Sequence, residues 1–292
     1  MDSKLVTVRT FLSLLLVLHA VSGWSSPQNA GGQSSGTPSA ALVQRALAAE
    51  LKATQDTGHP MRYRLRKSSI RLTSTKEIVE TKDGNVAILL SVDDKPLTPD
   101  DAQKDQNRLD ALMADPERQR HRKQNEDDDT GRALKVLRAL PKAFIYEYAG
   151  PGMAGSEPVE KFTFTPNTRF DPPDLETEVL TSLTGEIWID AARERVVRLE
   201  GHLQQDVNFG WGILGRLNKG GWIVIEQGEV GGGLWRVQRF RMEMSGRVLF
   251  KTRKFDTSEE ETDFAPVPAG LTYQQAIQML RSGQDAPKPG GR

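Results

Sequence analysis

The sequence predicts a mainly antiparallel α+β protein: a curved, half-open barrel of about eight to eleven strands with an N-terminal helix and a helical insertion. Between residues 62 and 255, many segments have an apolar residue at every second position. A period of three to four residues occurs only before, between and after these segments. A sheet with so many strands rarely stays flat, so we expect it to curl.

The composition limits the classes of function. The 292 residues contain 39 Lys+Arg, 39 Asp+Glu and no cysteine. The missing cysteine excludes disulfides, thiolate zinc sites, iron–sulfur clusters and a cysteine nucleophile. The balanced charge gives no general electrostatic reason to expect a nucleic acid as partner.

The first 23 residues are typical of a secretory signal peptide. Lys4 and Arg9 precede an apolar run over residues 11–18, and small residues follow up to Gly23. The run is much shorter than the roughly 20 residues that span a bilayer, and the chain has no cysteine to carry a lipid. We therefore expect cleavage near Ser22 or Gly23 and a periplasmic or secreted mature protein that does not span the membrane.

We expect four further segments after the signal peptide. Residues 24–38 are rich in Gly, Ser and Pro and predict a flexible linker. A half-barrel domain follows over residues 39–268, with a charged helical insertion over residues 93–141. Its first helix begins after the N-cap Ser39 and has an apolar stripe. A C-terminal helix over residues 269–281 and a disordered tail over residues 282–292 complete the chain.

The strands are predicted from alternation and turns. The hairpin over residues 186–204 is the clearest, with Val197, Leu199 and Leu203 on one face and charged residues on the other. A glycine run at 231–233 and a tight turn at Ser245–Gly246 are expected to separate the last three strands. The predicted strands are 62–66, 86–92, 144–148, 161–165, 186–189, 195–204, 222–230, 234–244 and 247–255.

The insertion contains a helix over residues 100–113, capped by Thr98 with Pro99 at its first position. Residues 117–129 are polar on every face and predict a solvated helix or loop. Within them, residues 125–131 resemble a calcium loop, but Thr130 stands where an EF-hand needs glycine. We therefore expect a solvated run of charges.

Residues 210–215 match the dinucleotide pattern G-x-G-x-x-G, which requires a helix directly after it. Only four residues separate Gly215 from the pair Gly220–Gly221, so a glycine-rich loop is favoured and no cofactor is expected. His59, His121 and His202 have no metal-ligand spacing, and no metal site is expected.

No nucleophile motif occurs, and no catalytic residue is assigned. The strands carry enough carboxylates for a catalytic pair of the kind glycosidases use, so this alternative stays open. The alternation of residues favours outward-facing carboxylates in salt-bridged rows instead. The candidate carboxylates are Glu186, Asp190, Glu200, Asp206, Glu226 and Glu229. Trp188 is unusual because it shares a strand face with Glu186 and Asp190, opposite Ile187 and Ile189.

The segment Gly185-Glu-Ile-Trp-Ile-Asp190, followed by Arg195-Val-Val-Arg-Leu199, resembles hairpins of uncharacterised secreted bacterial proteins. Together with the exported N-terminus, the first helix, the meander and the insertion, it resembles the LolA/LolB/RseB-like periplasmic half-barrels, the outer-membrane lipoprotein carrier-like superfamily. This resemblance implies a concave face that accepts acyl chains or another apolar partner.

The leading hypothesis is a non-enzymatic periplasmic binding or carrier protein for an apolar ligand, such as a lipid or a lipoprotein acyl chain. The alternative is an envelope protein–protein interaction or sensor module with a filled core, and an envelope hydrolase ranks third. The groove stays open unless the helices over residues 41–53 and 100–113 fill it. The expected ligand-binding residues are Ile187, Trp188, Ile189, Val197, Leu199, Leu203, Trp222 and Val224.

Overall fold

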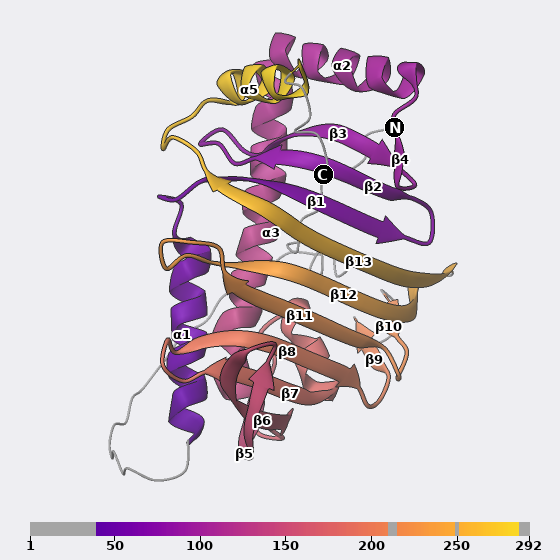
Figure 1. Ribbon diagram of the computed structural model, residues 1–292. Coiled ribbons are helices and arrows are strands. Elements are labelled where there is room, and N and C mark those ends of the chain that lie inside the picture. Colours follow the sequence, from indigo (N-terminus) through magenta and orange to yellow (C-terminus); the bar gives the residue numbers. More distant parts are fainter. Residues whose placement is uncertain (1–38, 210–214, 249–250, 286–292) are drawn as a thin grey trace.

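The computed structural model describes residues 39–209, 215–248 and 251–285 (Figure 1). The signal peptide, the linker and most of the glycine motif at 210–215 lie outside these residues. The helices are α1 (Ala40–Gln55), α2 (Pro99–Ala114), α3 (Pro116–Ala143), α4 (Leu175–Glu178) and α5 (Tyr273–Asp285), with a 3₁₀ turn, η2, at Val179–Ser182.

The strands form one open, antiparallel 13-stranded sheet in the order β4-β3-β2-β1-β13-β12-β11-β8-β7-β6-β5, with β10 paired to β12 and β9 to β10. The predicted fold class, a curved antiparallel sheet with an N-terminal helix and a helical insertion, is confirmed. The strands are β1 (Met61–Ser69), β2 (Thr73–Val79), β3 (Val86–Val92), β4 (Lys95–Pro96), β5 (Phe144–Ala154), β6 (Glu157–Pro166), β7 (Leu183–Asp190), β8 (Arg195–Leu203), β9 (Val207–Phe209), β10 (Gly215–Leu217), β11 (Trp222–Glu229), β12 (Trp235–Val248) and β13 (Lys251–Pro266).

The prediction of a tight turn at Ser245–Gly246 was wrong. β12 continues through both residues, and Gly246 pairs with Arg253 of β13. A Cβ atom at Gly246 would lie 2.3 Å from the carbonyl oxygen of Arg216 in β10. The glycine therefore allows a neighbouring strand to approach closely, which the sequence does not distinguish from a turn.

Strand β2 was missed in the sequence. Its only strongly apolar residues, Ile78 and Val79, are adjacent and not alternating, because each is buried on a different face. The pairing of β2 with β1 and β3 makes both faces visible: Ile78 lies opposite Tyr63 and Ala87, and Val79 lies opposite Val86. Periodicity alone does not identify such a two-sided strand.

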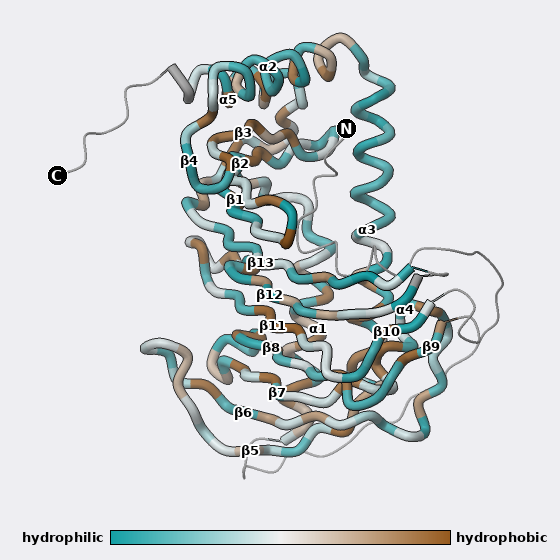
Figure 2. The backbone as a smooth tube through the Cα atoms, turned by 90° about the vertical axis from the view of Figure 1, so that its right-hand side faces the viewer, coloured by the Kyte–Doolittle hydropathy of each residue, from teal (hydrophilic) through white to brown (hydrophobic). Residues whose placement is uncertain are grey.

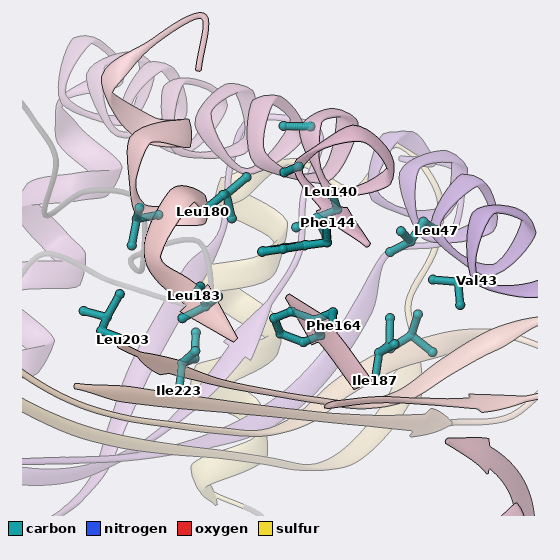
Figure 3. Close-up of a cluster of buried hydrophobic side chains, with 14 of the residues drawn as sticks. Val43, Leu47, Leu140, Phe144, Phe164, Leu180, Leu183, Ile187, Leu203 and Ile223 are labelled. Atoms are coloured by element: carbon teal, nitrogen blue, oxygen red, sulfur yellow. The ribbon is translucent and has the colours of Figure 1, made fainter. Parts of the chain in front are cut away.

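One face of the sheet, called here the inner face, carries the larger core. Phe162, Ile187 and Phe240 lie on it and pack with α1 and the C-terminal end of α3. Figure 3 shows Val43 and Leu47 of α1, and Leu140 near the end of α3, above strand residues that include Phe164 and Ile223. The opposite face is called the outer face.

The insertion is largely one long helix. α3 runs from Pro116 to Ala143 without a break, so residues 117–129 are helical, and the acidic run at 125–131 lies within the helix. The side chains of Gln119 and Arg122 donate hydrogen bonds to Asp83 O (2.7 Å) and Asn85 O (3.3 Å) in the β2–β3 turn. The N-terminal half of α3 is thereby tied to one end of the sheet, and its C-terminal end reaches β5 (Figure 1).

Helix α2 does not cover the inner face. Its residues Leu109 and Leu112 pack with α5 and with Val79, Val86 and Ile88, which point to the outer side of β2 and β3. Figure 1 shows α2 and α5 together beyond β3. Of the two helices that were expected to decide whether the groove is filled, only α1 lies over the inner face.

Candidate functional site

The inner face has two apolar regions with different covers. The first, called here the packed region, contains half of the predicted ligand-binding residues. Ile187 and Ile189 are fully buried, Leu203 is 2% exposed, and Leu199 is half-buried. α1, η2 and the end of α3 supply apolar partners for them (Figure 3). A ligand role for these residues stays a prediction, and it would require a helix to move.

The other predicted residues are not on the inner face. Trp188 pairs with Arg198, and Trp222 and Val224 pair with His202 and Glu200, so all three lie on the outer face. Val197 is skipped by a bulge between β7 and β8, and Val196 is buried in the packed region in its place. A bulge adds one residue to a strand, so strict two-residue counting misplaces the side chains beyond it.

Helix α1 is held over the packed region by a buried ion pair. Glu50 accepts hydrogen bonds from Arg195 Nε (2.8 Å) and Nη2 (3.0 Å) and from the Val196 amide (3.1 Å). Both side chains are only 12–13% exposed. A second pair between the same two parts of the chain, Arg45–Glu194 at 2.6 Å, is exposed to solvent.

The second apolar region, called here the uncapped cluster, lies on the inner face of β1, β2 and β3. It consists of Met61, Tyr63, Leu65, Ile78 and Ala87, each at most 3% exposed, and the partly buried residues Val230, Leu234 and Phe264 pack against it. Tyr63 and Phe264 stack with their ring centroids 5.4 Å apart. No residue of α1 or α3 belongs to this cluster in the described part of the chain.

The N-terminal half of α3 lies on this side of the sheet and is polar. Residues 117–132 contain no apolar side chain. Figure 2 shows the hydrophilic colour along most of α3, which stands beside the sheet. A helix that covers an apolar sheet face normally contributes an apolar stripe, as α1 does over the packed region. The uncapped cluster receives no such stripe from α3.

Buried charges lie next to the uncapped cluster. Lys67 donates to Glu259 at 2.6 Å, and the Glu259 side chain is 1% exposed. Burial raises the pKa of Glu259, and the nearby Lys67 opposes this shift. The other carboxylate oxygen of Glu259 has no hydrogen-bond partner among the described residues.

Lys76 is a buried charge that the sequence pattern did not reveal. It lies on the inner face of β2, directly opposite Leu65 of β1 and Leu89 of β3. Its pKa is lowered to about 8, mainly by burial and also by the neighbouring Arg108, Lys67 and Arg122, while Asp105 acts in the opposite direction. The signal in the sequence was a lysine two residues before Ile78, which is visible only once β2 is recognised.

The outer face carries a continuous row of charges across the sheet. Arg198 bonds to Glu226, Arg239 lies 3.6 Å from both Glu226 and Glu260, and Lys161 Nζ lies 4.0 Å from the Trp188 ring centroid. The row consists of Lys161, Trp188, Arg198, Glu226, Arg239, Glu260 and Arg66, each opposite the next. The unusual position of Trp188 is thus explained by cations on both sides.

The candidate carboxylates have structural partners. Hydrogen bonds from Arg198, and then from His202, hold the pKa of Glu200 below its usual value. Asp190 is buried rather than outward-facing, and it closes the β7–β8 turn by accepting from the Arg193 amide at 2.9 Å. The other partners are Trp188 for Glu186, Arg216 for Asp206, Arg198 for Glu226 and the Gly233 amide for Glu229.

The glycine motif and the metal-site prediction can be compared with the structure only within the described residues. The residues after the glycine motif form strand β10, not the helix that a dinucleotide site requires. Within residues 39–209, 215–248 and 251–285, no group of three or more His, Asp or Glu residues is arranged to hold a metal ion. In the same ranges, no helix is long and apolar enough to cross a membrane.

Several solved structures are similar to this chain at low identity. A proposed outer-membrane lipoprotein-sorting domain from Vibrio parahaemolyticus is 10% identical, with 82% of this chain and 99% of that chain covered and a TM-score of 0.33. A LolA superfamily protein from Nitrosomonas europaea is 9% identical, with 78% and 94% covered and a TM-score of 0.27. The Pseudomonas aeruginosa MucA/MucB complex is 9% identical, with 79% and 99% covered and a TM-score of 0.21.

No protein-family model matches the chain, and no curated protein matches its sequence. Because the identities and TM-scores are low, the function of this chain has to be inferred from its own residues.

Proposed function

We propose that the protein is an exported, non-enzymatic binding or carrier protein of the cell envelope, and that its ligand has an apolar chain, as a lipid or a lipoprotein acyl group has. The ligand lies on the inner face, against the uncapped cluster. One observation carries this proposal: Met61, Tyr63, Leu65, Ile78 and Ala87 face the side of the sheet along which α3 has no apolar residue over 117–132.

The physical argument compares the two halves of the inner face. In the packed region, α1 and the end of α3 supply the apolar side chains that an apolar sheet face requires. Beside the uncapped cluster, the helix offers charged side chains instead. The five residues are at most 3% exposed, so a ligand requires the side chains that cover them to move aside. A bound acyl chain would then contribute about 0.8 kcal/mol for each buried methylene.

The envelope location rests on the N-terminal sequence. The basic residues, the apolar run over 11–18 and the small residues that follow are typical of a cleaved signal peptide. A lipid carrier in an aqueous compartment has to shield its ligand from water, and the inner face of a curved sheet offers such a surface.

An interaction or sensor module is the second candidate. The packed region favours it, because α1, η2 and the end of α3 leave fully buried side chains such as Ile187 and Phe162 on that half of the inner face. In this alternative, a protein partner contacts an outer surface and no lipid is bound.

Native mass spectrometry of protein purified from the bacterial envelope distinguishes the two candidates. We expect a bound mass that organic extraction removes and that fragments as a lipid. Protein that carries no lipid, and that binds no fluorescent fatty-acid analogue, would rule out the carrier and leave the interaction module.

A further inference from the structure

The turn between β1 and β2 exposes two apolar side chains. Ile70 is 61% exposed and Leu72 is 44% exposed. The other large apolar side chains that are exposed in the described residues are Ile145 and Met153 of β5. The turn is ordered by Ser69, whose amide and hydroxyl group both donate to Leu72 O at 3.1 Å. Single apolar side chains on a surface need no explanation, whereas neighbouring ones indicate a contact site.

Exposed cations lie at the same end of the sheet as this turn. Ser69 is opposite Thr257 of β13, and the β12–β13 pair continues past that point. Figure 1 shows the β1–β2 turn and the start of β13 at one end of the strands, and Figure 2 looks onto that end. The exposed cations there that make no ion pair within the described part of the chain are Arg71, Arg247, Lys251 and Arg253.

The carboxylates at this end already have partners. These are Arg66 at 2.6 Å for Asp94, the Thr73 amide at 3.1 Å for Asp93, and Lys254 for Glu243, at 2.9 Å, and for Asp256. The four cations are therefore not neutralised by neighbouring side chains, and this end of the sheet attracts anions. Its charge complements a surface that is negative outside and apolar beneath.

We propose that this end of the sheet docks on the surface of an anionic phospholipid bilayer. Ile70 and Leu72 insert among the lipids, and Arg71, Lys251 and Arg253 lie against the phosphate groups. Peripheral membrane binding of this kind combines the burial of apolar side chains with the attraction of cations to anionic head groups. The inference goes beyond the proposed function, because it concerns a contact with a membrane and does not require a ligand on the inner face.

A bilayer fits this surface better than a folded protein does. A stable protein interface buries a large, closely packed surface with an apolar core. Two apolar side chains on one turn, with cations beside them, are too few for such a core. They suffice for reversible membrane binding, because each cation near an anionic bilayer strengthens binding by roughly fivefold.

Vesicle flotation tests the proposal. One set of vesicles contains three parts phosphatidylcholine and one part phosphatidylglycerol, and the other contains phosphatidylcholine alone. We expect the wild type to bind the anionic vesicles roughly tenfold or more tightly than the neutral ones. Binding should weaken strongly when NaCl rises from about 0.05 M to about 0.5 M, because salt screens exposed charges.

A matched pair of variants tests the apolar part. Ile70→Ser/Leu72→Ser should weaken binding to the anionic vesicles roughly tenfold or more, since neither side chain then gains from leaving water. Ile145→Ser/Met153→Ser removes a comparably exposed pair, 51% and 56%, from β5 and should leave binding unchanged. All four side chains are exposed, so circular dichroism should show both variants folded.

A second matched pair tests the charges. Lys251→Gln/Arg253→Gln should weaken binding roughly tenfold and reduce its dependence on salt. Lys52→Gln/Lys142→Gln makes the same change in net charge at exposed positions in α1 and α3, and it should have little effect on binding.

Insertion can be observed directly, because the chain has no cysteine. An environment-sensitive dye on the variant Ile70→Cys should shift its emission to shorter wavelength on anionic vesicles. The same dye on Ile145→Cys should not shift.

The outcomes separate membrane docking from the carrier function. If the protein binds neither kind of vesicle, binds both equally, or loses as much binding in Ile145→Ser/Met153→Ser as in Ile70→Ser/Leu72→Ser, the docking proposal is overturned. An unshifted dye at residue 70 overturns it as well. Binding of a fluorescent fatty-acid analogue should be the same in Ile70→Ser/Leu72→Ser and in the wild type, so failure of docking leaves the carrier function standing.

Discussion

At the residue scale, the contacts of this protein are decided by which face of a strand a side chain occupies. Lys161 and Lys76 both lie on strands, yet one stacks on Trp188 in the solvated row of the outer face, and the other lies beside Leu65 and Leu89 on the inner face. Solvent weakens the interactions of the first, whereas partial burial makes the charge of the second costly. The same residue type thus has a different environment on each face of the sheet.

The two ion pairs that join α1 to β8 and its turn should differ strongly in their contribution to the free energy of unfolding. Glu50→Ala should lower the free energy of unfolding by about 3 kcal/mol, because it leaves Arg195 and the Val196 amide buried without their partner. Arg45→Ala removes the exposed pair with Glu194 and should change the free energy of unfolding by less than about 1 kcal/mol. Urea unfolding of both variants makes the comparison. Equal effects would mean that Glu50 does not hold α1 in place.

At the element scale, α3 combines a polar N-terminal half with an apolar C-terminal end. Leu140 and Ala143 are buried in the packed region, whereas residues 117–132 are held by ion pairs such as Lys123–Asp127 and by the bonds to the β2–β3 turn. Apolar packing therefore holds the C-terminal end, whereas ion pairs and hydrogen bonds hold the N-terminal half. The polar half is the part of the helix next to the proposed ligand.

Two glycines, Gly131 in α3 and Gly185 in β7, differ in the space available for a Cβ atom. A Cβ atom at Gly131 of α3 would meet nothing within 4 Å, so Gly131→Ala should stabilise the helix by about 0.5–1 kcal/mol and raise Tm by about 2 °C.

Gly185→Ala in β7 is the matched contrast. Its Cβ atom would lie 1.8 Å from the carbonyl oxygen of Glu200, so the change should destabilise the protein by about 1–3 kcal/mol. Calorimetric melting of both variants should move Tm in opposite directions. A lower Tm for Gly131→Ala would mean that this part of α3 is not a regular, unstrained helix.

At the scale of the whole molecule, the two ends of the open sheet differ. At one end, β4 is only two residues long and contains Pro96. Beside it, Asp105 and Arg108 of α2 bond to the free backbone groups of Leu89 and Ala87 in β3. At the other end, β5 is an 11-residue edge strand with Ile145 exposed. Short edges, proline and side-chain caps protect a sheet from unwanted pairing, so the β3–β4 end is the better protected one.

Export is the prediction that belongs to the whole chain. The mature protein should begin close to Trp24 and carry no acyl group, because the apolar run over residues 11–18 is too short to anchor it and no cysteine is present. N-terminal sequencing of material from the envelope fraction decides this. A retained Met1 in washed membranes would show that the run is an anchor and would remove the envelope carrier from consideration.

The sequence by itself determined the antiparallel sheet, the first helix and most strands, since two- and three-to-four-residue periods are local properties of the chain. It also placed Ile187, Ile189 and Leu203 on a buried face. Only the tertiary structure decided what covers each face: that α1 packs over Ile187, that α2 turns to the outer side, and that Lys76 lies beside Leu65. Register, bulges and the packing of distant segments set these contacts, and no local period encodes them.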